Sequence, residues 1–426
     1  MFAKQWKFTA LLLAVVLLLA ACSPTATPES DPTEAPTEVV TEAPVEESTD
    51  EPTEEADATE VAEPTGPLTI TPPEEPAVCE MIPDVPAREV DETDWVKGAE
   101  DAEITIIEYA DFQCPGCSGI APALTQFLEN HPEARLVYRH FPLSFHDKAM
   151  VTAAASEAAG AQGKFWEMYD LLFSRAAEWG SLTPEEARDK MSEYAEELDL
   201  DLERFDQELD DDVYAEKINA HYEEAVELGL PGTPTFIFNG QMFPTEMGLS
   251  YNGLEAFLTV LEMEDKQVDE VPEMVVDAEG SYEATLKTSQ GDIVVELLPE
   301  SAPTLVNSFI YLAEEGWYDD ADFFFVQDNF VALAGDPSNT GFGHPGYYCM
   351  GESQGTFDRS GLVGILPNGQ FFITLGLDAS SLTGQFALIG QVTEGLEVAE
   401  ALARTLPGDP SAPEADVLES IAVLEK

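Results

Sequence analysis

The hydrophobic positions of this chain change their spacing along the sequence, and each spacing predicts a different kind of structure. A dense apolar run covers residues 8–19, and residues 23–76 then contain Thr, Pro, Glu, Ala and little else. From residue 104 onward, apolar residues form short β-branched runs typical of strands, or recur every three and four residues as in helices. The pattern therefore predicts a leader, a polar segment and a long folded remainder.

The first 21 residues have the features of an export signal. Lys4 and Lys7 give a positive start, and the apolar run that follows is too short to span a bilayer comfortably. The run ends in Leu-Ala-Ala before Cys22, which resembles the bacterial lipobox, where the Cys is lipidated and becomes the new amino terminus. The resemblance implies a lipid-anchored, extracytoplasmic protein, and an uncleaved membrane anchor is the alternative.

Residues 22–80 are predicted to be a disordered tether. Residues 23–76 hold no Lys or Arg, and their apolar side chains are too few to offset the entropy lost on ordering. The whole chain has a formal net charge of −66, and this segment holds only a minority of the acids, so the folded parts must be acidic too. Such a charge argues against nucleic-acid binding and against docking on anionic lipid through a basic patch.

The folded remainder is roughly 350 residues long, which is too many for one ordinary hydrophobic core, so we expect two domains. The first is predicted at residues 81–262 and the second at residues 281–426. The polar residues 263–280 between them are predicted to be a linker.

The first domain is organised around a strand followed by two cysteines. Residues 104–108 predict a buried strand, and Cys114 opens a predicted helix with Pro115 at its first position. Cys114 and Cys117 share one face of the first helical turn and can close a disulfide, while the helix start favours a thiolate on Cys114. A structural disulfide or half of a zinc site are the alternatives. Since no second Cys-x-x-Cys exists, we expect no metal site, and we expect no cofactor.

Further elements of this domain follow from the apolar spacing. A second strand is predicted at residues 135–143, a hairpin turn at Asn239 and Gly240, and a last helix at residues 251–261. Between them lie four predicted helices, at residues 149–161, 165–173, 184–198 and 213–228.

This order of elements resembles the DsbA-like branch of the thioredoxin superfamily over about residues 90–262. The matching residues are Phe112, Cys114, Pro115, Gly116, Cys117, Phe141, Pro142, Leu143, Gln162, Gly163, Lys164, Phe165, Trp166, Gly232, Thr233, Pro234 and Thr235. The resemblance implies a redox-active Cys114–Cys117 pair, a cis Pro234 lying against it, and a Thr233 backbone that hydrogen-bonds an extended substrate. An ordinary trans turn at Pro234 is the alternative.

The charges near the cysteines suggest the strength of the oxidant. Strong oxidants of the family often carry a His between the cysteines, whereas Pro115 and Gly116 supply no charge here. Glu108 and Asp111 lie close in sequence and oppose a thiolate. We therefore expect a milder oxidant, or a reductase or isomerase.

Beyond residue 280, short alternating strands are separated by many Gly turns. Strands are predicted at residues 282–288, 292–297, 323–326, 330–333, 371–374 and 387–392, and helices at 302–314 and 398–403. Many short strands with two helices suggest a closed β-barrel.

The same region resembles a cyclophilin-type prolyl isomerase over about residues 282–425. The matching positions are 291–297, Ala302, Pro303, Asn307, Ser308, Phe309, Gly335, Asp336, Pro337, 370–374, Leu382, Gly384, Gly390, Val392 and Gly395. The resemblance implies a substrate pocket of Phe330, Phe372 and Leu382 with Gln370 beside it. The alternative is that these side chains are simply barrel core.

The chain departs from the cyclophilin pattern at the polar positions of that pocket. Phe325 stands where the family has an Arg that hydrogen-bonds the prolyl nitrogen, Leu333 stands for a Gln, and Ser381 and Phe386 stand for a Trp and a His. We therefore expect weak prolyl isomerase activity or none, with peptide binding still open.

Two further cysteines remain once Cys22 is lipidated and Cys114 pairs with Cys117. We hypothesise that Cys79 and Cys349 form a structural disulfide that ties the two domains together, and two free thiols are the alternative.

Together, these patterns and resemblances predict a multidomain protein. An α/β thioredoxin fold with an inserted helical block is followed by a cyclophilin-like closed β-barrel. The predicted function is thiol–disulfide oxidoreduction on exported proteins during folding, at the cell surface or in the periplasm. The expected partners are those proteins and a membrane redox partner that reoxidises or reduces the cysteine pair. The alternatives are a folding chaperone, or an active peptidyl-prolyl isomerase whose thioredoxin domain is a binding module.

Overall fold

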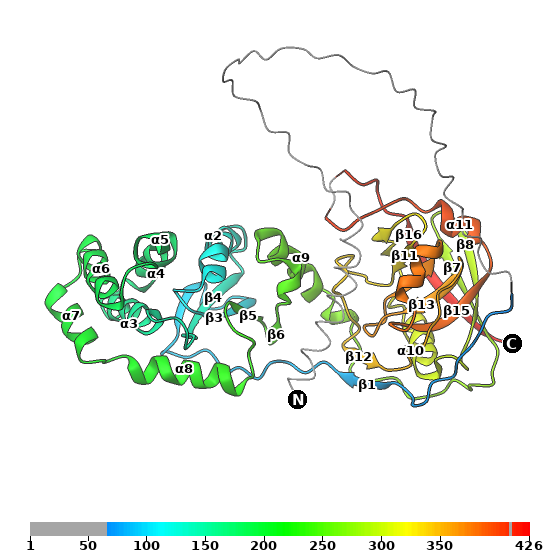
Figure 1. Ribbon diagram of the computed structural model, residues 1–426, viewed down its shortest axis with the longest axis horizontal. Helices are drawn as coiled ribbons and strands as arrows, with labels where there is room; N and C mark the ends of the chain where they lie inside the picture. The colour runs from blue at the N-terminus through cyan, green and yellow to red at the C-terminus, as the bar shows by residue number, and fades with distance from the viewer. Residues whose placement is uncertain (1–65, 409–410) are drawn as a thin grey trace, which may run out of the picture. The chain divides into compact units, whose positions relative to one another are not determined.

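The computed structural model describes residues 66–408 and 411–426, whose helices and strands are labelled in Figure 1. The predicted leader at residues 1–21, the lipidation site Cys22 and most of the predicted tether lie outside the described residues. Within the described ranges, no helix combines the length and the apolar character that crossing a bilayer requires.

The first domain contains a five-stranded sheet with the order β2-β4-β3-β5-β6. The strands are β2 (Trp95–Gly98), β3 (Ile104–Ala110), β4 (Ala134–His140), β5 (Thr235–Phe238) and β6 (Gln241–Met242). Strands β3 and β4 are parallel, and the other pairs are antiparallel. Strand β3 occupies the middle of the sheet, and five of its seven residues are buried, which explains its β-branched composition.

Helices cover both faces of this sheet. On one face, α2 (Pro115–Asn130) and α9 (Tyr251–Leu261) share a hydrophobic core with Ile106 and Phe236. On the other face, α8 (Ala215–Glu227) packs against Val137 and Ile237.

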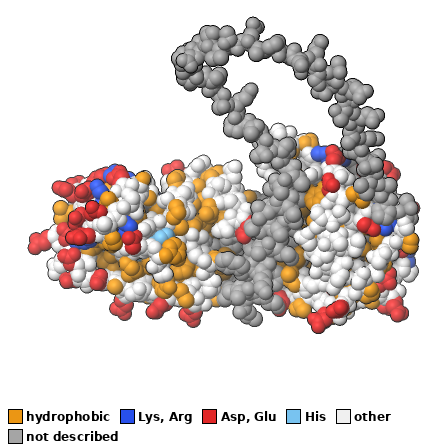
Figure 2. Space-filling model, in the orientation of Figure 1, with side chains coloured by type: hydrophobic (Ala, Val, Ile, Leu, Met, Phe, Trp, Pro, Cys, Tyr) orange, Lys and Arg blue, Asp and Glu red, His pale blue; other side chains and the backbone are white. Residues whose placement is uncertain are grey.

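The remaining helices of the domain gather into one block beside the sheet (Figure 1). They are α3 (Ala149–Gly160), α4 (Phe165–Ser174), α5 (Ala176–Trp179), α6 (Pro184–Glu197) and α7 (Leu202–Asp210). The sequence did not predict α5 or α7. Helix α7 buries only Phe205 and Leu209, so its apolar stripe is too narrow to stand out among acidic residues. Acidic side chains crowd over this end of the block (Figure 2).

The second domain is a nine-stranded antiparallel sheet curled into a half-barrel, with the order β10-β11-β14-β13-β15-β8-β7-β16-β9. Its strands are β7 (Tyr282–Thr288), β8 (Gly291–Leu297), β9 (Ala321–Asp322), β10 (Phe325–Val326), β11 (Val331–Ala334), β13 (Leu362–Ile365), β14 (Phe371–Thr374), β15 (Ala387–Glu394) and β16 (Val417–Glu425). Helices α10 (Pro303–Glu314) and α11 (Leu396–Ala401) complete the domain. The predicted thioredoxin-like and cyclophilin-like folds are confirmed, but the sheet of the second domain is a half-barrel and not the closed barrel that we expected, since its edge strands β10 and β9 do not pair with each other in the described part of the chain.

A short strand before the first domain belongs to the second. Strand β1 (Val78–Met81) pairs antiparallel with β12 (Tyr347–Met350), and Cys79 lies opposite Cys349. The two cysteines form a disulfide across 270 residues of sequence. We had expected residues 78–80 to belong to the disordered tether. They form a strand instead, because β12 supplies the backbone hydrogen-bond partners.

The expected linker at residues 263–280 is also held against the second domain. Val268 N–H donates to the Pro345 carbonyl at 3.0 Å, and the Asn307 side chain bonds the backbone at Glu273, Val275 and Val276. On the other side of the first domain, Ile82 N–H donates to the Gly346 carbonyl at 2.8 Å. The chain thus enters and leaves the first domain beside the same turn of the second.

Candidate active site

The cysteine pair lies where β3 passes into α2. Strand β3 ends at Ala110, and a three-residue loop leads to Cys114, whose N–H donates to the Asp111 carbonyl at 2.9 Å. Cys114 is the N-cap of α2 and Pro115 its first residue. Cys114 retains 7% exposure while Cys117 is fully buried, and both are free thiols.

The loop before β5 covers this pair. The Thr233–Pro234 peptide bond is cis, and the Cys114 thiol donates a hydrogen bond to the Thr233 carbonyl at 3.3 Å. A Cβ atom at Gly116 would lie 3.1 Å from Pro234 Cδ and 3.6 Å from Cys114 Sγ, so a residue without a side chain fits best there. The structure therefore places Thr233 against Cys114 and Pro234 against Gly116.

The two thiols have opposite acidities. The pKa of Cys114 is lowered to about 5, chiefly by a hydrogen bond from the Cys117 side chain. Burial opposes this shift, while Thr233 and the backbone N–H groups of Gly116 and Cys117 add to it. The pKa of Cys117 is raised well above its usual value, first by burial and then by Cys114 and Glu108. Cys114 is therefore the thiolate at neutral pH and Cys117 the protonated thiol.

A buried carboxyl lies behind the pair. Glu108 is fully buried, and its Oε2 accepts a hydrogen bond from the Tyr169 hydroxyl at 3.1 Å. Its Oε1 has no hydrogen-bond partner among the described residues. Burial raises the pKa of Glu108 to about 8, so the group is mostly protonated at pH 7.

These positions correct the expectation that nearby acids weaken the thiolate. Glu108 carries little charge at neutral pH because it is buried. Asp111 is engaged elsewhere: its Oδ2 accepts from His146 Nδ1 and from Leu143 N–H, each at 2.8 Å. The expectation of a milder oxidant, or of a reductase or isomerase, stays a prediction. A lone Glu inside a buried apolar strand was the sequence signal for an altered pKa.

The segment after β4 is attached to the active-site loop. Lys148 N–H donates to Gln113 Oε1 at 2.7 Å, and Gln113 Nε2 donates to Asp147 at 3.0 Å. Two residues before Asp147, Phe145 is 76% exposed. Sequence reasoning missed Phe145, since the Phe-Pro-Leu motif before it drew attention to buried residues.

The pocket expected in the second domain is filled by its own side chains. Phe330, Phe372 and Leu382 are all buried, at 7%, 2% and 3% exposure. Phe325 stands edge-on to Phe330 with ring centroids 6.3 Å apart, and Phe386 stands edge-on to Phe372 at 5.8 Å.

Gln370 is committed to the backbone in the same region. Its Nε2 donates to the carbonyls of Gly341 at 3.0 Å and Gly343 at 3.2 Å, and the residue is 1% exposed. The arrangement therefore presents apolar rings where the cyclophilin pattern places polar groups.

Comparison with known proteins separates the same two regions. The family model described as "Thioredoxin" matches residues 90–259, and the model described as "Cyclophilin type peptidyl-prolyl cis-trans isomerase/CLD" matches residues 284–423. One curated relative, Na(+)/H(+) antiporter NhaA 1 of Salinispora arenicola, is 43% identical over 162 residues, which are 38% of this chain and 23% of that protein. The chain thus spans about a quarter of the length of the curated relatives it matches.

Two solved structures illustrate the separate likenesses. A thioredoxin-like oxidoreductase from Silicibacter pomeroyi is 25% identical, with 36% of this chain and 83% of that chain covered and a TM-score of 0.30. A cyclophilin type peptidyl-prolyl cis-trans isomerase from Cryptosporidium parvum is 24% identical, with 34% and 99% covered and a TM-score of 0.30. The two family models place a thioredoxin-type domain at residues 90–259 and a cyclophilin-type domain at residues 284–423 of this chain.

Proposed function

We propose that the first domain is a thiol–disulfide oxidoreductase that oxidises cysteines of exported proteins during folding. The observation that carries this proposal is the acidic Cys114 thiol at the start of α2, with a pKa of about 5, beside the protonated Cys117. A stabilised thiolate favours the reduced form of the pair, and this makes its disulfide an oxidant.

The proposed oxidation of a client proceeds in two thiol–disulfide exchange steps. A client thiolate attacks Cys114 Sγ of the Cys114–Cys117 disulfide, and Cys117 leaves as a thiolate that takes up a proton. A second client thiolate then attacks the client sulfur of the mixed disulfide, and Cys114 leaves as a thiolate. The client dithiol is oxidised by two electrons, and the pair is reduced by two. A disulfide of a membrane redox partner restores the pair by the reverse exchange.

Thr233 and Pro234 position the client in this proposal. The Thr233 carbonyl lies 3.3 Å from Cys114 Sγ and just before β5, so an extended client chain can bond to the backbone there. Glu108 accepts or returns the proton of Cys117, since it is buried near that thiol and has a pKa of about 8.

The second domain is proposed to bind polypeptide without appreciable isomerase activity. Phe325 offers no donor to a prolyl nitrogen, and the surrounding rings are closely packed. The alternatives are a chaperone and an active isomerase with a passive thioredoxin domain. The acidic Cys114 favours the redox reading over both, since neither alternative needs it.

We further propose that the protein is extracytoplasmic and anchored by lipid on Cys22. The apolar leader and its Leu-Ala-Ala-Cys ending support this location. The Cys79–Cys349 disulfide is of the kind that persists in oxidising compartments.

The experiment is oxidative refolding of a reduced, disulfide-containing protein by the full chain with its Cys114–Cys117 pair oxidised. We expect disulfides to appear in the client in step with thiols in the pair. A chain with Ser at both positions serves as the control for holding activity. If that control refolds the client equally well, the redox proposal is wrong and the chaperone reading holds.

A further inference from the structure

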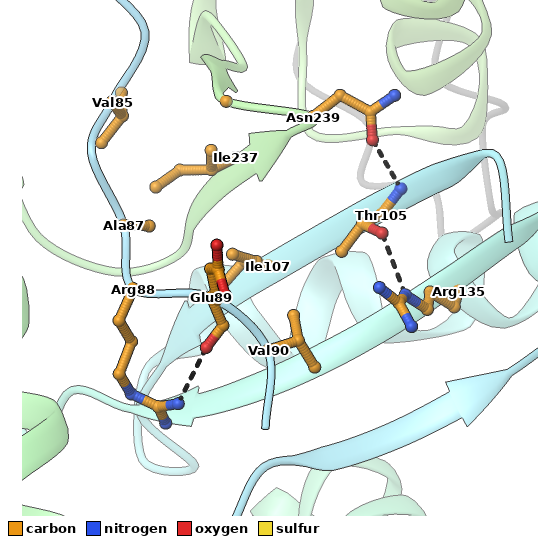
Figure 3. A pocket seen from close by; sticks show the side chains of 11 residues that line it. Val85, Ala87, Arg88, Glu89, Val90, Thr105, Ile107, Arg135, Ile237 and Asn239 are labelled. Carbon is orange, nitrogen blue, oxygen red and sulfur yellow. Dashed lines mark hydrogen bonds between the residues drawn. The ribbon is translucent and has the colours of Figure 1, made fainter. Parts of the chain in front are cut away.

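A cavity of about 400 Å³ lies against the first-domain sheet, away from the cysteine pair (Figure 3). Its floor is formed by Ile107 on β3 and Ile237 on β5, and residues 85–90 pass over it as an extended strap. Thr105, at the start of β3, closes one end. Five residues of strand, roughly 16 Å, separate Thr105 from Ala110, after which the Cys114 loop begins.

The walls of the cavity are fixed by hydrogen bonds. Val85 N–H donates to the Gly240 carbonyl at 2.7 Å, and Arg88 N–H donates to Glu224 Oε1 at 3.0 Å, so the strap is held at two points. Asn239 joins the hairpin turn to β3 by accepting from Thr105 N–H at 2.8 Å. A cavity with fixed walls and this volume is in the range of small-molecule sites.

Arg135 is the unusual side chain of this cavity. All eight arginines of the chain lie within the described residues, and seven of them pair with a carboxylate. Arg135 alone among these eight has no carboxylate partner, although the chain holds 84 acidic residues. Its Nε donates to Thr105 Oγ1 and its NH1 to the Glu100 carbonyl, each at 2.9 Å.

Several donors at this end of the cavity therefore remain available. A guanidinium has five N–H groups, and Arg135 commits two of them. The Thr105 hydroxyl accepts from Arg135, so its own proton is free to be donated. Figure 3 shows the guanidinium turned toward Thr105, with the aliphatic side chains of Val90, Ile107 and Ile237 beyond it.

The other charges of the lining do not compete strongly. Arg88 is paired with Asp91, Asp94 and Glu224. Glu89 is exposed to solvent. Its negative charge repels a bound polyanion more strongly than it repels a ligand with a single negative charge. Among the residues that line the cavity, Arg135 is the one cation without a carboxylate partner, and a single such charge favours a monoanion over a nucleotide or another polyphosphate.

We propose that this cavity binds a small organic carboxylate with an apolar body. The carboxylate lies on the Arg135 guanidinium and the Thr105 hydroxyl, and the apolar body lies against Ile107, Ile237 and Val90. A fork of guanidinium donors matches the two oxygens of a carboxylate, and the aliphatic walls remove the remainder of the ligand from water. The site is separate from disulfide exchange and holds whether or not the proposed redox function does.

The test is titration of the full chain with hexanoate, followed by calorimetry, with hexanol as the uncharged probe. We expect hexanoate to bind and hexanol to bind at least about tenfold more weakly, since a charge-assisted hydrogen bond is lost. Equal binding of the two probes would overturn the assignment to Arg135. A tripeptide ending in Leu, with its carboxylate free or amidated, tells whether a chain terminus fits better than a free acid.

Two variants test the same site from different sides. Arg135→Gln removes the charge, and Ala87→Leu fills the cavity from the strap without changing charge. Both should weaken hexanoate binding at least about tenfold. Arg175→Gln, which removes a partly exposed arginine paired with Glu197, is the matched control and should leave binding unchanged. Unfolding curves show that each variant is folded, and hexanoate binding that survives in both folded variants refutes the proposal.

Discussion

The two domains treat the polar groups of their candidate sites in opposite ways. In the first, two thiols and a carboxyl are buried together, and one carboxyl oxygen of Glu108 has no hydrogen-bond partner within residues 66–408 and 411–426. In the second, Gln370 is tied to backbone carbonyls and aromatic rings fill the pocket. Both domains keep the fold of their family. The difference shows that chemical activity depends on a few polar groups that are not fully hydrogen-bonded, and not on the fold that holds them.

The largest expected effect breaks the first side of this comparison. Cys114→Ser should lower disulfide exchange by at least about 10³-fold, because the attacking and attacked sulfur is lost. Cys117→Ser should instead accumulate mixed disulfides with client proteins through Cys114. The rate of disulfide exchange is measured from the loss of client thiols, and mixed disulfides are detected on non-reducing gels. Full exchange by the Cys114→Ser chain would falsify the assignment.

The second prediction tests the other side of the comparison. The second domain should isomerise prolyl bonds at least about 10²-fold more slowly than ordinary cyclophilins, since Phe325 offers no donor to the twisted amide. A protease-coupled assay on the full chain with Ser at positions 114 and 117 measures this rate.

A matched pair of substitutions shows whether Phe325 is responsible. Phe325→Arg should raise the isomerisation rate, whereas Phe324→Arg, at the neighbouring buried position, should not. A wild-type rate equal to that of ordinary cyclophilins contradicts the prediction, whatever the variants do.

The third prediction concerns the buried carboxyl. Because the pKa of Glu108 is about 8 in the folded chain and 4.5 in model compounds, the folded state keeps a proton that the unfolded state has lost. The free energy of unfolding should therefore fall by roughly 2–4 kcal/mol as pH rises from 4.5 to 8. Glu108→Gln should remove this pH-dependent loss. Glu296, which is exposed on β8 of the second domain, provides the matched control, Glu296→Gln. Denaturant unfolding at both pH values measures this free energy. If it changes equally with pH in the wild type and in Glu108→Gln, Glu108 is not a buried neutral acid.

The smallest effect sharpens the assignment of the thiolate. Attack by reduced Cys114 on a small disulfide should slow about tenfold between pH 6 and pH 4, because a thiol with a pKa of about 5 is protonated in that window. The folded pKa lies below the unfolded value, so thiolate stabilisation of the reduced chain is complete above the unfolded pKa and is lost as pH falls through 5. Stopped-flow rates measure it, and a midpoint near 9 contradicts it.

The sequence predicted most strongly where one local pattern decides the structure. The β-branched run of β3, the Cys-x-x-Cys spacing and the alternation in β7 depend only on neighbours along the chain. Strand β13 failed this test, since all four of its residues are buried and Gly364 leaves room for the Phe372 ring. Strand β16 failed because a register shift between Leu418 and Ser420 breaks its alternation.

The candidate site shows the same division. The spacing of Cys114 and Cys117 was legible from the sequence, but the pKa of Glu108 depends on burial by the inserted helices, which supply Tyr169. The cavity at Arg135 was not predicted at all, since the absence of a carboxylate partner is a property of three-dimensional neighbours and not of composition.

The pairing of β1 with β12 sets an order of events during synthesis. Strand β1 is made before the first domain, yet its partner strand is made 270 residues later, so β1 must wait unpaired while the first domain folds. Closing this contact is a non-local step, whose entropy cost comes from the length of chain between the two strands. During that interval another copy's β12 is an equivalent partner. Newly made chains at high concentration therefore face a choice between a closed monomer and an exchanged dimer with β1 swapped.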